Sequence, residues 1–309
     1  MKAHKHLMPR AFAFFFCFFF FSQPLLAQGT GTVHFKSHTQ ELDARNKVFR
    51  MEGDAMLRND SMELRAKRIT IHFVSGGESK NFSGKSVETL RARENVRILQ
   101  EGILSEGAEA FYTSTKGTLL LKGKPAKVSG TDFHVTGLEI LYGQTGEKMD
   151  VKGGKEKPSS FYHANNGAPL TIHSSEQHWD MQKGSVLFSG KILAKTETHT
   201  LESDELLVTY HRNEEKDSPA TVETGRENII IDTVTAMGRV RITDAQGTGL
   251  GDKAVFTENN DTIILTGEPA EVTYKGHKIQ GPQIRMNQKT GEMEVSGGAS
   301  GRLLPKDKK

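Results

Sequence analysis

Cysteine is almost absent from this chain of 309 residues, because Cys17 is the only one. Cys17 lies inside a short apolar segment near the N-terminus, at residues 11–21. The remainder of the chain therefore has no disulfide, no cysteine metal site and no cysteine nucleophile, and its stability must come from packing and strand pairing.

Long apolar runs are scarce as well. Residues 11–21 are well short of the roughly 20 needed for a membrane-spanning helix. They follow Lys2, Lys5 and Arg10 and precede a Leu-Leu-Ala sequence at residues 25–27. This pattern is typical of a signal peptide, and we expect cleavage after Ala27. The alternative is an uncleaved anchor that ties the protein to the inner membrane.

An excess of either charge is also missing. The chain has 41 Lys and Arg against 38 Asp and Glu, and loss of residues 1–27 leaves 38 against 38. A neutral chain lacks the cationic surplus that nucleic-acid binding requires, so we expect no nucleic-acid partner. Apolar residues make up only 35% of the chain, as expected when strands have one apolar and one wet face.

The sequence contains an internal repeat instead. Residues 33–73 recur at a spacing of 137, and residues from 96 onward recur at a spacing of 144. The strongest match aligns residues 119–126 with residues 263–270. Apolar residues alternate in segments of four to eight, broken by Gly, Asn or Asp, and this period predicts short antiparallel strands. No helical period is evident after the signal segment, so the predicted fold class is all-β.

The repeat also predicts the division of the chain. In order, we expect a signal peptide at 1–27, a first module at 33–153, a linker at 154–169, a second module at 170–297 and a polar C-terminal tail at 298–309.

The second module contains short motifs whose order resembles that of the OstA-type module of the LptA family. They are Pro169-Leu170-Thr171-Ile172-His173-Ser174, Asp180-Met181, Val186-Leu187-Phe188-Ser189-Gly190, Leu206-Leu207-Val208, Gly251-Asp252-Lys253-Ala254-Val255-Phe256 and Ile263-Ile264-Leu265-Thr266-Gly267. The resemblance implies two tandem open β-jelly-rolls, also called β-tacos, of antiparallel strands. It also implies a periplasmic protein that carries lipopolysaccharide, with the lipid A acyl chains held in an apolar groove.

The same resemblance implies partners. They are LptC-like components at the inner membrane and LptD-like components at the outer membrane, with head-to-tail self-association as a further option. The chain departs from the usual family pattern because it has two modules, so the first module could be LptA-like, LptC-like or LptD-like.

Strand parity selects the residues that would line such a groove. They are Leu170, Ile172, Val186, Phe188, Ile192, Val208, Phe256, Ile263 and Leu265 in the second module, and Phe35, Phe49, Met51, Ile71, Tyr112, Leu119 and Leu121 in the first. The competing interpretation is that these residues form an ordinary sandwich core.

Other candidate sites in the sequence lack the residue spacing that a metal, phosphate or dinucleotide site requires. His34 and His38 would lie roughly 13 Å apart on an extended strand, too far to share a metal. Gly84-Lys85-Ser86 lacks the earlier glycine of a phosphate loop, and Gly247–Gly251 lacks the spacing of a dinucleotide fingerprint. We therefore expect no catalytic residue, no metal and no cofactor. Two rival functions are a secreted structural or adhesive β-repeat protein without a lipid ligand, and an envelope enzyme acting on polysaccharide.

Overall fold

A computed structural model describes residues 32–74, 87–130, 133–143, 147–154, 156, 158–165, 168–212, 229–257, 262–287 and 290–302. The predicted signal peptide with Cys17, the motif at residues 84–86 and residues 303–309 of the predicted tail lie outside these ranges.

Every regular element of the described residues is a β-strand, which confirms the all-β prediction. The strands are β1 (His34–Lys36), β2 (Thr39–Asp43), β3 (Val48–Arg58), β4 (Met62–Phe73), β5 (Val87–Gln100), β6 (Ile103–Thr113), β7 (Thr118–Ser129), β8 (Phe133–Gly143), β9 (Lys148–Lys152), β10 (Ser159–Asn165), β11 (Ala168–Ser174), β12 (Glu176–Asp180), β13 (Ser185–Lys195), β14 (Thr200–Arg212), β15 (Ile229–Thr243), β16 (Gly247–Thr257), β17 (Thr262–Tyr274), β18 (His277–Asn287), β19 (Met293–Ser296) and β20 (Ser300–Arg302). Neighbouring strands pair antiparallel, as the period of two predicts.

The described chain divides into two compact units. The N-terminal unit runs up to Tyr162 and takes in a later segment, Ser175–Gln182. The C-terminal unit contains His163–Ser174 and the residues from Lys183 onward. Residues 154–169, predicted as a linker, contain β10 and the beginning of β11.

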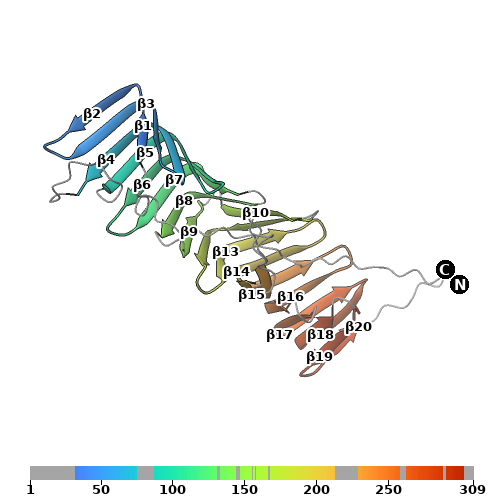
Figure 1. Ribbon diagram of the computed structural model, residues 1–309. Coiled ribbons are helices and arrows are strands. Elements are labelled where there is room, and N and C mark those ends of the chain that lie inside the picture. The colour runs from blue at the N-terminus through green and yellow to red at the C-terminus, as the bar shows by residue number, and fades with distance from the viewer. Residues whose placement is uncertain are drawn as a thin grey trace, which may run out of the picture. The chain divides into compact units, whose positions relative to one another are not determined.

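In the N-terminal unit, β3 to β9 pair in chain order and lie side by side (Figure 1). β1 and β2 both pair with β3 at one edge. At the other edge β9 pairs with β12, whose sequence follows β11 in the chain.

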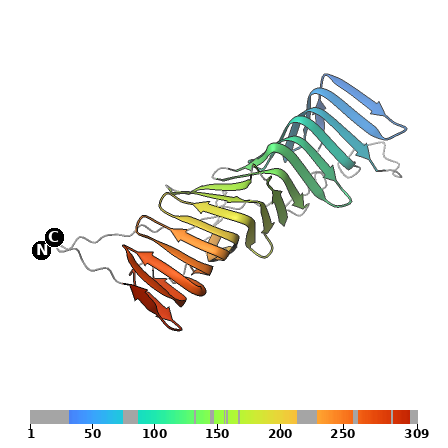
Figure 2. The ribbon, with the colours of Figure 1, turned by 180° about the vertical axis from the view of Figure 1, so that it is seen from behind.

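The C-terminal unit repeats this plan. β11 pairs with β13, and β13 to β18 then pair in chain order (Figure 2). β19 and β20 both pair with β18, at its two ends.

The backbone irregularities follow the internal repeat. Gly53 and Asp54 have positive φ at a bulge in β3, and Gly190 and Lys191 have positive φ at the corresponding bulge in β13, 137 residues later. Farther along, the bulge of β5 and the bulge of β15 correspond at the spacing of 144. Because a bulge bends the strand that carries it, a line of bulges across neighbouring strands bends the whole sheet.

Candidate functional site: an apolar groove in the C-terminal unit

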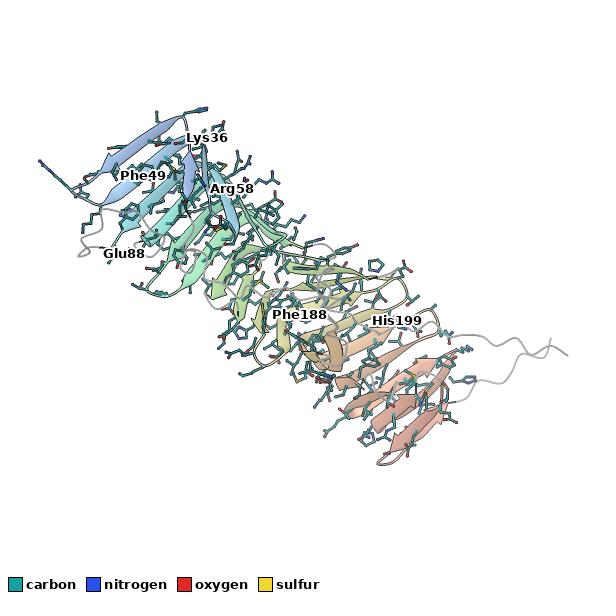
Figure 3. The ribbon with its side chains drawn as sticks, viewed as in Figure 1. Lys36, Phe49, Arg58, Glu88, Phe188 and His199 are labelled. Carbon is teal, nitrogen blue, oxygen red and sulfur yellow. The ribbon has the colours of Figure 1, made fainter. Side chains whose placement is uncertain are left out.

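The line of bulges divides the C-terminal sheet into two halves that face one interior. The register is interrupted between Ser189 and Ile192 on β13, and at matching places on β14 to β18. On β13 buried side chains occur on both sides of the interruption, at Phe188 in one half and Ile192 in the other (Figure 3 labels Phe188).

Between the two halves lies an apolar groove in two adjoining stretches. The larger stretch has about 510 Å³ of space between its lining atoms and the smaller about 330 Å³, and both volumes include space that is open to solvent. The larger is lined by Ile242, Asp244, Gly247, Thr248, Gly249, Ile263, Leu265, Val272, Thr273, Tyr274, Ile284 and Met286. The smaller is lined by Leu201, Val234, Ala236, Ile242, Ala254, Phe256 and Ile263.

The register assigns the lining residues to two walls. Val234, Phe256, Ile263 and Met286 follow one another across β15 to β18 in one half of the sheet. Leu201, Ile242, Gly249 and Val272 follow one another across β14 to β17 in the other half. The groove is therefore the space between two facing sheet halves, which is the geometry of an open jelly-roll.

The repeat shows why the groove is open in this unit. Gly249 and Met286 occupy the positions that Ser105 and Tyr142 hold in the N-terminal unit. Ser105 and Tyr142 are both buried, and Tyr142 fills the interior with a large ring. Burial raises the pKa of the Tyr142 phenol, although the neighbouring Ser105 side chain opposes this shift. In the C-terminal unit, a glycine and a flexible methionine leave that volume free.

A polar cluster lies at one rim of the groove, where two hairpins end. The Asp244 carboxylate accepts hydrogen bonds from the backbone N–H groups of Gln246 and Gly247, both at 2.7 Å. The Tyr274 hydroxyl donates to the Gln246 side-chain oxygen at 2.6 Å. These bonds hold the β15–β16 turn and the end of β17 together, so the rim is polar while the floor is apolar.

His199 approaches the same rim from the hairpin between β13 and β14 (Figure 3). Its Nε2 atom lies 3.8 Å from the Asp244 Oδ2 atom. Burial lowers the pKa of His199, and the negative charge of Asp244 acts in the opposite direction. The imidazole is therefore a neutral polar group near pH 7 at the edge of the apolar surface.

The structure buries most of the residues selected from the sequence. Leu170, Ile172, Val186, Phe188, Ile192, Val208, Phe256, Ile263, Leu265, Met51, Ile71, Tyr112, Leu119 and Leu121 are all buried. Among them Phe256, Ile263 and Leu265 line the groove. Burial alone fits a sandwich core as well as a lipid site, so the lipid-binding role of these residues stays a prediction.

Phe35 and Phe49 do not fit the prediction of a buried lining. Phe35 is 51% exposed, and Phe49 is half-buried, with the two rings 5.1 Å apart in an edge-to-face contact. Both lie on the first strands of the N-terminal unit. Their counterparts by the repeat, Ile172 and Val186, are buried in the C-terminal unit.

Several lining residues were not selected from the sequence, including Leu201, Ile242 and Val272. Leu201 and Val272 have the opposite parity to the inward residues on the other side of the bulge in their strands, because a bulge can move later side chains to the opposite face. Ile242 keeps the parity of Val234. Gly53 and Gly190, at matching repeat positions, mark the bulges of β3 and β13. Parity counted separately on each side of the bulge on β17 identifies Val272.

In the part of the chain that the structure describes, no group of three or more His, Cys, Asp or Glu side chains could hold a metal ion. No helix long and apolar enough to span a membrane occurs in the same residues.

Comparison with known proteins gives a family. The family described as "LptA/(LptD N-terminal domain) LPS transport protein" matches residues 34–148 and 171–292. The two matched segments cover most of the chain, which therefore belongs to this family of lipopolysaccharide transport proteins. The resemblance found in the sequence is thereby confirmed.

One similar solved structure is LptH from Pseudomonas aeruginosa, described as the LptA homologous periplasmic component of the conserved lipopolysaccharide transport device. It is 12% identical, with a TM-score of 0.36, and the alignment covers 44% of this chain and 96% of LptH. No curated protein sequence matches the chain.

Proposed function

We propose that this protein binds lipopolysaccharide in the periplasm and forms part of a bridge from the inner to the outer membrane. The observation that carries the proposal is the apolar groove between the two sheet halves of the C-terminal unit. In a chain of this family, the apolar floor of the groove suits acyl chains, and the polar rim suits a polar head group.

The groove would hold lipid by burial and without covalent chemistry. Each methylene group that leaves water contributes about 0.8 kcal/mol, so even one acyl chain that lies along the groove is retained strongly. Because Ile263, Leu265 and Met286 offer similar apolar surfaces, the chains can move among equivalent positions. We therefore propose a carrier, with direction supplied by an energised inner-membrane partner.

The proposed protein partners are LptC-like components at the inner membrane and LptD-like components at the outer membrane. Strand edges are suited to such contacts because their unpaired backbone groups accept another strand. The terminal strands β2 and β19 supply these edges in the two units.

A photo-crosslinking experiment in cells tests the proposed ligand. A photoreactive amino acid is placed at Leu265 or Met286, which line the groove, and at their neighbours Ile264 or Arg285, which lie on the opposite strand face. We expect lipopolysaccharide to be captured at the two lining positions and not at the two outward controls. Equal capture at all four positions, or none at any, would contradict the proposal and favour a structural β-repeat protein.

A further inference from the structure

The two units differ in how well the same apolar residues are covered. Ile242 and Val272 line the larger stretch of the groove and are half-buried. At the spacing of 144, their counterparts in the N-terminal unit are Ile98 and Val128, which are the same residue types. Ile98 is 4% exposed and Val128 is 2% exposed. The matched side chains therefore face open space in one unit and are covered in the other.

The residues around these side chains account for the difference. At three groove-lining positions the N-terminal unit has a larger side chain. In the C-terminal unit these positions hold Gly247, Gly249 and Met286. Their counterparts, all of them buried, are Ile103, Ser105 and Tyr142. More side-chain volume is thus packed into the same space between the two sheet halves.

The Tyr142 ring crosses the interior from one half of the N-terminal sheet to the other. Tyr142 on β8 is opposite Leu119 in one half. Ser105 on β6 is opposite Ile98 and Val128 in the other half. Burial raises the pKa of the Tyr142 phenol and the Ser105 side chain acts against this shift, so the two hydroxyl groups are neighbours. The ring therefore lies over the wall that contains Ile98 and Val128.

The C-terminal unit has the same two walls without a ring at this place. Gly249 is opposite Ile242 and Val272 on one wall, and Met286 belongs to the other. Methionine is unbranched and adapts to its surroundings, whereas the ring of tyrosine is rigid. A Cβ atom at Gly249 would meet the Leu265 Cδ2 atom at 3.4 Å, an ordinary contact distance, so the backbone would accept the serine of the other repeat.

The two differences between the repeats depend on each other. Burial of a hydroxyl group costs free energy unless a polar group lies beside it. Ser105 supplies such a group for Tyr142, and a glycine at the same position would not. An ordinary apolar core would not require this pair, because the matched positions Gly249 and Met286 belong to a sheet of the same plan.

We propose that Tyr142, with Ser105 beside it, keeps acyl chains out of the N-terminal unit, so that the protein holds its lipid in the C-terminal unit. The inference deepens the proposed function and rests on it, because it takes an acyl chain to be the occupant of the groove. Leu119 and Leu121, which strand parity selected as lipid contacts, then belong to a closed core.

Photolabelling of the purified protein with a fatty acid tests the proposal. The probe is a palmitic acid analogue with a diazirine near the end of its alkyl chain, and the labelled peptides are identified by mass spectrometry. We expect labelling on β15 to β18, and at least about tenfold less on the matched strands β5 to β8. Equal labelling of the two sets of strands, or labelling of neither set, would overturn the proposal.

Exchange of the two residues between the repeats tests the role of Tyr142 directly. Tyr142→Met with Ser105→Gly gives the N-terminal unit the residues of the C-terminal unit, and labelling of β5 to β8 should rise at least about tenfold. Met286→Tyr with Gly249→Ser makes the reverse change, and labelling of β15 to β18 should fall by a similar factor. Unchanged labelling in either folded variant would overturn the proposal.

The reverse exchange removes no buried side chain from the N-terminal unit, so it tests the proposal even if the first variant does not fold. Tyr142→Phe keeps the ring and loses the hydroxyl group, and β5 to β8 should stay as weakly labelled as in the wild type. Leu141→Met with Leu104→Gly makes comparable changes on the outward faces of the same strands and is expected to label as the wild type. A rise in this control as large as in the inward exchange would overturn the proposal, because loosened strands would then admit the probe.

These results are independent of lipopolysaccharide capture at Leu265 and Met286 in cells. Failure of that capture would contradict the proposed function, while the fatty acid would still distinguish the two units. Equal labelling of both units by the fatty acid would overturn this inference, while lipopolysaccharide capture would still support the proposed function.

Discussion

At Gly249 a single hydrogen atom takes the place of a side chain in one wall of the groove. A Cβ atom built there would meet only the Leu265 Cδ2 atom, at 3.4 Å, and the backbone is in a conformation open to other residues. The counterpart in the N-terminal unit, Ser105, is buried beside Tyr142. The size of the residue at this position therefore decides how much of the interior stays open.

Replacing Gly249 by phenylalanine should fill the groove, because the backbone at this position has a conformation that phenylalanine can also adopt. The ring would displace about three lipid methylene groups, or about 2.4 kcal/mol of burial. We expect roughly fiftyfold weaker lipid binding, seen as lower capture at Leu265 with the photoreactive probe. Leu250→Phe, on the outward face of the same strand, is the control, and equal loss in both variants would contradict the argument.

Among the elements, the bulged strands determine the curvature of each sheet. Gly190 on β13 and Gly53 on β3 both have a φ of +77°, in the left-handed region that favours glycine. Both are followed by a second residue of positive φ, Lys191 or Asp54. This pair of residues bends each strand at the same place, and the bend brings the two sheet halves to face each other.

We expect Gly190→Ala to lower the free energy of unfolding by about 1–2 kcal/mol, the cost of a side chain in the left-handed region. Ser189→Ala, one residue earlier on the same strand, is the control and should cost less. Urea unfolding followed by circular dichroism measures both values. Equal midpoints for the two variants would show that the bulge does not depend on glycine.

These bulges also explain which features of the fold and of the groove could be predicted from the sequence. Alternation and turn residues were enough to predict an all-β fold, because they depend on local spacing, and comparison of the sequence with itself was enough to find the internal repeat. Alternation also placed Phe188 and Leu265 in the interior correctly. It missed Val272, because the parity changes at a bulge, and it did not show that Phe35 lies on an edge strand with its ring exposed. Which apolar positions face open space depends on the size of residues far apart in sequence, such as Gly249 and Met286.

On the scale of the whole molecule, the two units exchange segments of chain. The chain passes from the N-terminal unit into β11 of the C-terminal unit, returns to the N-terminal unit as β12, and leaves again as β13. A strand from the second repeat is therefore part of the first sheet. The edge of β9 is therefore protected by the chain itself.

Trp179 is the anchor of this exchange, and it is the only tryptophan of the chain. Its ring packs on Phe161, and its indole N–H donates to the Gln177 side chain at 3.2 Å. Trp179→Ala removes both contacts and should weaken the packing of β12 on β9 by about 3–5 kcal/mol. Hydrogen exchange of the β9 amides should then become at least about a hundredfold faster.

The C-terminal unit supplies the internal reference for this measurement, since β17 pairs only with β16 and β18 in the described residues. If β12 closes the first sheet, exchange at β17 should stay near its wild-type rate in Trp179→Ala. Trp179→Phe keeps an aromatic ring against Phe161 and should show a smaller effect than the alanine variant. Unchanged protection of β9 in Trp179→Ala would mean that backbone pairing alone, without the Trp179 ring, holds β12 on β9.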